Sequence, residues 1–307
     1  MTADSLSASS VHDRPVPPQP PRGWQNWVSQ RLFSALSPRL KRPNLPPTPE
    51  RLQPFEEVAI PRRGRGGQLA GIFFPAQPEA VDGGPEAVHR GAVLLGHPWM
   101  EWGQTYFHRR GRIETLRRRG YDVLTYDLSG FGASAAPQGF FQLDVEDALE
   151  WLHQRVPQGA LHCWGVSSGG YWMHPVLAAR RGAAQRVGGA MFEDVSPHLI
   201  EWSGNTAPHG IPFYLCFRHV TPTAYRFFDL REHAATFDLA AVSYVVGDQD
   251  RGIPTADARE LARRSGAEIL VVPEAKHLSA IKRAQHEVLA LAVETFRKAE
   301  EAGSQAQ

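Results

Sequence analysis

The sequence predicts an α/β protein in which helices cover both faces of a mostly parallel central sheet. Short apolar runs alternate along the chain with stretches of helical character, which is the pattern of successive strand–helix units. These runs are almost uninterrupted by polar residues, as expected of parallel strands that are buried on both sides. With 307 residues, 42% of them hydrophobic, the chain is long enough for one large domain with a sizeable core.

The first predicted element is an antiparallel hairpin. FEEVAI (55–60) and QLAGIFF (68–74) are short runs with β-forming residues, and the glycine-rich RRGRGG (62–67) between them favours a turn. This hairpin precedes the alternating part of the chain.

Six further strands are predicted, and most are followed by a helix. The strands are GAVLLGH (91–97), YDVLTYD (121–127), ALHCWGV (160–166), VGGAMFEDV (187–195), VSYVVGD (242–248) and AEILVVPE (267–274). The helices are expected over 105–119, 142–155, 168–181, from about Pro254 onward, and over 279–298. The fourth strand is followed by a long region that is expected to be irregular.

The chain is divided into an arm, residues 1–50, a domain, residues 51–300, and a tail, residues 301–307. The arm holds 10 of the 25 prolines and is expected to be extended. Between its proline clusters, Trp24, Val28, Leu32 and Leu36 recur at helical spacing beside several arginines. Such a helix either packs onto the domain or makes peripheral membrane contact through residues 22–42.

Composition and motifs exclude several classes of protein. A formal charge of +1 gives no basic excess for nucleic acid, and no signal peptide or membrane-spanning stretch is evident, so a cytoplasmic protein is expected. Cys163 and Cys216 are expected to be small buried hydrophobes. No phosphate-binding or dinucleotide-binding glycine motif occurs, and the histidines lack ligand-like spacing, so no cofactor and no metal are expected. The oligomeric state is left open.

The segment Gly165–Gly169 (GVSSG) joins an apolar strand to a helix. A serine at such a strained turn projects its hydroxyl above the carboxyl edge of the sheet, and small neighbours are required there. Ser167 is therefore the candidate nucleophile. A glycine-rich connection without chemistry is the alternative.

A serine nucleophile needs a base, an acid that orients the base, and donors for the oxyanion. His277 follows the last strand, and Asp248 and Asp250 follow the strand before it, so all are expected at one edge of the sheet. The backbone N–H groups of Ser168 and Trp99 are the candidate donors, because Pro98 has none.

Together these segments resemble the α/β-hydrolase superfamily over about residues 55–298. His97-Pro98-Trp99 is similar to its oxyanion loop, although proline replaces the usual glycine, and 127–134 (DLSGFGAS) is similar to a turn that is expected to be structural. The resemblance implies the α/β-hydrolase fold, a Ser-His-Asp triad, and Asp250 as the acid. Some members carry the acid after the sixth strand, which leaves Asp194 as an alternative.

An insertion over 196–238 is expected to form a short lid. Its aromatic residues predict either an apolar lining for a small-molecule acyl substrate or packing against the domain: Trp202, Phe213, Tyr214, Phe217, Tyr225, Phe227 and Phe228. The arginine run over 109–119 is expected to be a solvated face, with Arg109 or Arg110 as a possible contact for an acidic group.

The function expected is that of a serine hydrolase that cleaves a carboxylic ester, thioester or amide with an apolar acyl group. The reaction would pass through an acyl-enzyme on Ser167, with His277 as base and Asp250 as acid. Two alternatives are an acyltransferase with the same triad and a non-catalytic binding or scaffold protein on the same fold.

Overall fold

A computed structural model of the chain describes residues 16–36, 47–79, 88–99, 103–206 and 210–305. Eight strands form one sheet in the order β1-β2-β4-β3-β5-β6-β7-β8. Their bounds are β1 (Glu56–Pro61), β2 (Gln68–Phe74), β3 (Gly91–Gly96), β4 (Tyr121–Tyr126), β5 (Ala160–Val166), β6 (Val187–Glu193), β7 (Ala241–Gly247) and β8 (Glu268–Val272). The strands β1 and β2 are antiparallel and the other six run parallel, which confirms the predicted hairpin and mostly parallel sheet.

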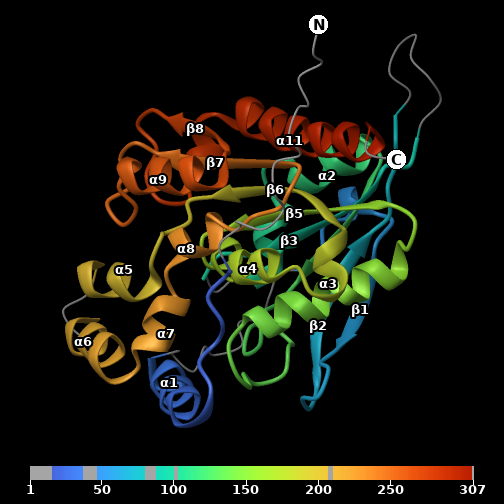
Figure 1. Cartoon of the computed structure of the whole chain (residues 1–307). Coiled ribbons are helices and arrows are strands. Elements are labelled where there is room, and N and C mark those ends of the chain that lie inside the picture. Colours follow the sequence, from blue (N-terminus) through green and yellow to red (C-terminus); the bar gives the residue numbers. More distant parts are fainter. Residues whose placement is uncertain (1–15, 37–46, 80–87, 100–102, 207–209, 306–307) are drawn as a thin grey trace, which may run out of the picture.

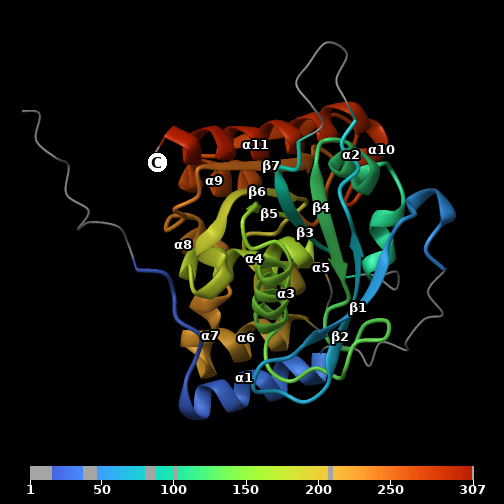
Figure 2. The same cartoon turned by 90° about the vertical axis from the view of Figure 1, so that its right-hand side faces the viewer.

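Helices cover both faces of this sheet (Figure 1). The α-helices of the described chain are α1 (Gly23–Leu36), α2 (Arg112–Arg118), α3 (Gln142–Arg155), α4 (Ser168–Ala179), α5 (Leu199–Thr206), α6 (Gly210–Val220), α7 (Pro222–Phe227), α8 (Leu230–Ala234), α9 (Thr255–Ser265), α10 (Ala280–Arg283) and α11 (Gln285–Gln305). One face carries α2, α10 and α11, and the other carries α3, α4, α8 and α9 (Figure 2). This is the α/β-hydrolase fold class that the sequence predicted. No described helix is long and apolar enough to span a membrane.

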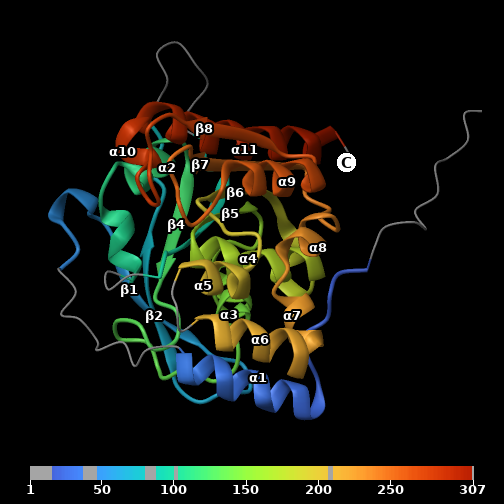
Figure 3. The same ribbon diagram turned by 90° about the vertical axis from the view of Figure 1, so that its left-hand side faces the viewer.

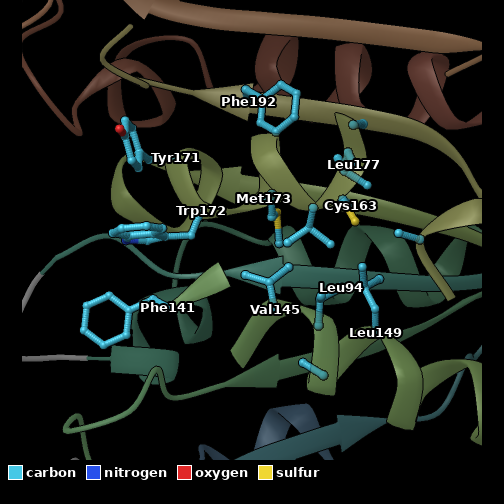
Figure 4. Close-up of a cluster of buried hydrophobic side chains, with 14 of the residues drawn as sticks. Leu94, Phe141, Val145, Leu149, Cys163, Tyr171, Trp172, Met173, Leu177 and Phe192 are labelled. Atoms are coloured by element: carbon cyan, nitrogen blue, oxygen red, sulfur yellow. The ribbon is translucent and has the colours of Figure 1, made fainter. Parts of the chain in front are cut away.

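The larger core lies between the sheet and the face that carries α3 and α4. Figure 4 shows Met173 of α4 near Val145 of α3, and Trp172 of α4 near Phe141, in one cluster with Leu94 of β3. These side chains are at most 1% exposed. Burying such a side chain stabilises the fold by roughly 1.5–3 kcal/mol, so this layer fixes α4, the helix that begins directly after Ser167.

The strand registers bring the functional loops to one edge of the sheet. Val166 at the end of β5 pairs with Glu193 at the end of β6, and Gly247 of β7 pairs with Val272 of β8. The carboxyl ends of parallel strands meet at one edge, which is where α/β proteins bind ligands. The segments that follow β5, β6, β7 and β8 are therefore neighbours.

The helix expected over 105–119 is interrupted. A 3₁₀ turn (Gly103–His108) and α2 replace it, and Arg110 and Gly111 between them have φ values of 66° and 71°. Two successive residues with positive φ cannot continue a right-handed helix. The last helix, expected over 279–298, is likewise divided into α10 and α11 at Ala284. Most of the expected tail is also helical, because α11 continues to Gln305.

The region after β6 is helical, which corrects the expectation of irregular structure. It contains the four helices α5 to α8, three of which have eight residues or fewer. Isolated helices of this length are marginal in water. Their stability comes from packing on the domain, which the sequence pattern of this region does not display.

The helix expected in the arm is present as α1. It lies beside α6 and α7 (Figure 3), and the Thr223 backbone N–H donates to the Gln25 side chain at 3.3 Å. Leu32 packs against the main core. The helix is therefore docked on the domain, as one of the two alternatives expected. The parts of the predicted arm over residues 1–15 and 37–46 lie outside the described residues.

Candidate active site

Ser167 lies at a sharp turn between β5 and α4. Its φ and ψ of 49° and −117° are unfavourable for a residue with a side chain, and such strain is often stored at functional sites. The Ser167 backbone N–H donates to the Glu193 carbonyl at 2.8 Å, which ties the turn to the end of β6. This geometry corresponds to a nucleophile elbow.

The glycines of the elbow are required by close contacts. A Cβ atom on Gly165 would lie 2.2 Å from the Gly170 Cα, and one on Gly169 would lie 2.2 Å from the Gly96 carbonyl. Real Cβ atoms do not approach backbone so closely, so larger residues would force the segments apart. The second contact also holds the end of β3 against the start of α4.

His277 is placed between Ser167 and Asp250. Its Nε2 lies 3.2 Å from the Ser167 Oγ, and its Nδ1 lies 2.7 Å from the Asp250 Oδ2. A carboxylate oxygen accepts, so Nδ1 carries the proton and donates to it. The Nε2 lone pair then faces the serine hydroxyl, which is the tautomer needed to take its proton.

Asp250 is buried and held in a fixed orientation. Its second oxygen, Oδ1, accepts from the backbone N–H groups of Gly252 at 2.9 Å and Ile253 at 3.1 Å. Both oxygens are therefore engaged. The alternative in the same loop, Asp248, is exposed to solvent, and within the described part of the chain it makes no hydrogen bond or ion pair with His277.

The side chain of Asp194, the other alternative acid, contacts the backbone of the loop that carries His277. Its two oxygens accept from the N–H groups of Gly247 at 3.4 Å and Leu278 at 2.7 Å. Burial, together with the charges of Glu193 and Asp250, raises the pKa of Asp194 to about 7. Asp194 thus contacts the residue after His277, whereas Asp250 contacts the imidazole ring itself.

Opposing effects act on the pKa of His277. Burial disfavours its charged form, but the hydrogen bond and charge of Asp250 outweigh it, with additional contributions from Asp194 and Glu193. The net result is a pKa above the ordinary histidine value. An arrangement with these charges favours the imidazolium form of His277.

The two segments expected to supply oxyanion donors are in contact. The Ser168 hydroxyl donates to the His97 carbonyl at 3.3 Å, across the close approach of β3 and α4. Trp99 is half-buried, with its ring centroid 5.1 Å from that of Phe131 and 5.4 Å from that of Phe141. The loop that carries Trp99 is thus packed beside the elbow that carries Ser168.

His97 fixes this loop, a role that the motif did not reveal. The Leu128 backbone N–H donates to its Nε2 at 3.0 Å, so its Nδ1 carries the proton and donates to the Pro98 carbonyl at 2.8 Å. That carbonyl belongs to the same planar peptide as the Trp99 N–H. Burial lowers the pKa of His97 to about 4, which keeps the ring neutral and the arrangement intact near neutral pH.

The only group of possible metal ligands found among the described residues is Asp194, Asp250 and His277, whose ligand atoms lie within 4.8 Å of one another. In this group, Asp250 already pairs with the imidazole, and both Asp194 oxygens accept backbone N–H groups. The carboxylate oxygens of this group are therefore already engaged by N–H donors within the protein.

The aromatic rings of the insertion were expected either to line a substrate site or to pack against the domain. Phe217, Phe227 and Phe228 are buried in the main core, so they attach the insertion to the domain. Trp202 packs against a small buried cluster of Val246, Ile253 and Ala258. The described contacts therefore favour packing for much of this set. The side chain of Phe213 lies outside the described residues.

The arginine run is only partly a solvated face, which corrects the sequence expectation. Arg112 is buried, and its Nη2 contacts the two oxygens of Glu193 at 2.7 and 2.9 Å. Its guanidinium lies over the rings of Tyr106 and Trp164, 5.0 and 5.3 Å from their centroids. Arg117 is also buried and donates to the Leu52 carbonyl at 2.7 Å. Of the two cysteines, Cys163 is fully buried as expected, whereas Cys216 is only partly buried.

The contacts of the turn over 127–134 hold its own backbone and a neighbouring segment in place. The Asp127 carboxylate accepts from the Gln104 backbone N–H at 2.7 Å, and the Ser134 hydroxyl donates to the Asp127 carbonyl at 2.7 Å. Burial raises the pKa of Asp127 to about 7. None of these contacts involves the three side chains around Ser167.

Comparison with known proteins agrees with this architecture. The sequence matches the family described as "alpha/beta hydrolase fold" over residues 92–208. No curated protein sequence matches the chain.

Among solved structures, the Pyrococcus furiosus esterase Pf2001 has a TM-score of 0.64 and 17% identity, covering 84% of this chain and 98% of that one. The alpha/beta hydrolase GrgF from Penicillium sp. sh18 has a TM-score of 0.60 and 15% identity, covering 81% and 99%. The acylaminoacyl peptidase of Pyrococcus horikoshii has a TM-score of 0.58 and 14% identity, covering 81% and 42%. The family match over residues 92–208 and the likeness to these structures both agree with the α/β-hydrolase fold of this chain.

Proposed function

We propose that this protein is a serine hydrolase that cleaves carboxylic esters with an apolar acyl group. The observation that carries the proposal is the chain of hydrogen-bonding distances from Ser167 Oγ through His277 to Asp250, 3.2 and 2.7 Å. A hydroxyl, a correctly oriented imidazole and a buried carboxylate are the groups that activate a serine nucleophile.

In the proposed reaction, Ser167 Oγ attacks the ester carbonyl while its proton passes to His277 Nε2. Asp250 stabilises the imidazolium, and the backbone N–H groups of Ser168 and Trp99 donate to the oxyanion. The tetrahedral intermediate then expels the alcohol, which takes the proton from His277. Water attacks the acyl-enzyme in the same manner, with His277 again as base, and releases the carboxylic acid.

Two considerations support an ester with an apolar acyl group. The alcohol that leaves an ester needs less assistance than the amine that leaves an amide. One structural neighbour is described as an esterase, and another with the same fold is described as a peptidase. Trp99 in the oxyanion loop and Leu278 directly after the histidine are only partly buried, and they leave apolar surface near the site.

A panel of p-nitrophenyl esters with acyl groups of graded length and charge tests the proposal. Wild type is expected to hydrolyse uncharged apolar esters best, and Ser167→Ala is expected to lose about 10⁶-fold in kcat. Ser265→Ala is the matched control, since its hydroxyl donates to the Leu261 and Ala262 carbonyls within α9. Preference for charged acyl groups, or equal rates in wild type and Ser167→Ala, contradicts the proposal.

The same assay separates the alternatives. With added alcohols or amines, an acyltransferase forms new esters or amides in place of free acid. A scaffold protein hydrolyses no member of the panel.

A further inference from the structure

One side of the molecule exposes apolar side chains that the proposed reaction does not use. On α1, Trp24 and Trp27 are each 62% exposed, and on α6, Ile211, Leu215 and Val220 are 54, 48 and 45% exposed. We call these five residues the α1–α6 surface. Exposed tryptophans are uncommon on a monomer, and a group of large apolar residues on adjacent helices marks an interaction site.

The two helices form one side of the molecule. In Figures 1 and 3, α1 lies along the end of the molecule and α6 runs next to it. On its inner side, α1 is held by Leu32, which packs on the core, and by Gln25, which accepts from Thr223 of α7. The tryptophans are therefore exposed by a docked helix and not by a loose end.

Charge on this side has one sign. None of the 32 acidic residues of the chain lies in α1, α6 or α7. Arg31 lies over the Trp27 ring at 5.3 Å, and Arg218 lies over the Tyr214 ring at 5.6 Å. Both arginines are exposed, and neither has an ion pair with another described residue.

Carboxylates on the neighbouring helices are already paired. Glu201 of α5 binds Arg231 at 3.2 Å and accepts from Tyr225 at 2.6 Å. Glu232 of α8 binds Arg226 at 3.0 Å. Neither carboxylate forms an ion pair with Arg31 or Arg218, although the charge of Glu201 acts on Arg218 without direct contact.

We propose that the α1–α6 surface binds the interface of a lipid bilayer that carries anionic headgroups. Tryptophan is enriched at the boundary between headgroups and acyl chains, and arginines there pair with phosphates while their stems contact apolar surface. A second copy of the chain fits less well, because a twofold contact would bring the same arginines together without any carboxylate from these helices. This inference does not depend on the proposed function.

Vesicle sedimentation of the full-length chain tests the inference. Vesicles of phosphatidylcholine mixed with phosphatidylglycerol are compared with vesicles of phosphatidylcholine alone. Wild type is expected to bind the mixed vesicles more strongly, with a difference that shrinks as salt is added. Arg31→Gln and Arg218→Gln are each expected to weaken binding by about fivefold.

Removing both indoles, in Trp24→Ser/Trp27→Ser, is expected to weaken binding by roughly tenfold or more. Val88→Ser is the matched control, because Val88 is 54% exposed and lies outside α1, α6 and α7. Ester hydrolysis by the tryptophan variant in vesicle-free buffer is measured in parallel and is expected to equal wild type.

Three results would overturn the inference. They are no sedimentation with either vesicle, equal sedimentation of wild type and the tryptophan variant, and self-association without lipid that the tryptophan variant abolishes. The last result would assign the surface to a second copy of the chain.

Discussion

The Asp194 carboxylate accepts a hydrogen bond from the Leu278 backbone N–H at 2.7 Å, directly beyond His277. Both residues have positive φ, 52° and 58°, so two strained positions meet at this contact. The contact fixes the loop that carries the imidazole, while Asp250 orients the ring. Asp194 is thus a positioning residue in the proposed site.

Asp194→Asn is expected to lower kcat by roughly tenfold to a hundredfold, because a small misplacement of a reacting group has an effect of this size. Asparagine tolerates positive φ but offers one acceptor oxygen in place of two. The acid limb of the pH profile should also move to lower pH, since a negative charge near His277 is lost. An unchanged pH profile would assign Asp194 a merely structural role.

The pH dependence of kcat/KM follows from the raised pKa of His277. The base must be neutral, so activity should rise with pH through a midpoint above the ordinary histidine value of about 6.5. Asp250→Asn should lower kcat by about 10⁴-fold and shift the residual midpoint downward, because the partner that favours the imidazolium is gone. A wild-type midpoint below 6 would contradict this assignment.

His97→Ala should lower kcat by up to about 10²–10³-fold with little change in KM, the effect of misplacing one oxyanion donor. The reason is that the ring holds the peptide between Pro98 and Trp99. His286→Ala, at an exposed position on α11, serves as control. Wild-type kcat in a folded His97→Ala protein would remove Trp99 from the proposed site.

The buried pair of Arg112 and Glu193 should matter for stability. Arg112→Met leaves a buried carboxylate without its partner and is expected to reduce the free energy of unfolding by about 3–5 kcal/mol in urea denaturation. Arg112→Met/Glu193→Leu should recover most of that loss. A double variant as unstable as the single variant would show that the ion pair itself is required.

The strands and the positions of the candidate site residues could be predicted because their signals are local. Buried parallel strands read as apolar runs, and Ser167 and His277 each follow such a run at the same edge of the sheet. The sequence motif also predicted that the elbow needs glycines. The atoms that these glycines contact, in Gly96 and Gly170, are known only from the structure.

Other features depend on contacts that a sequence pattern does not contain. The short helices after β6 are stabilised by rings such as Phe217 and Phe228, which are buried against the domain. Arg112 resembles its solvated neighbours in sequence, but its guanidinium lies over aromatic rings and contacts Glu193. The contact of Asp194 with Leu278 joins two loops 84 positions apart.

The most direct test of the proposed site is labelling with a fluorophosphonate, which forms a covalent adduct with an activated serine. Intact-mass and peptide mass spectrometry of wild type should show one adduct, on Ser167, and His277→Ala should react far more slowly. Absence of an adduct on wild type, or an adduct that persists in Ser167→Ala, would contradict the assignment of Ser167 as the nucleophile.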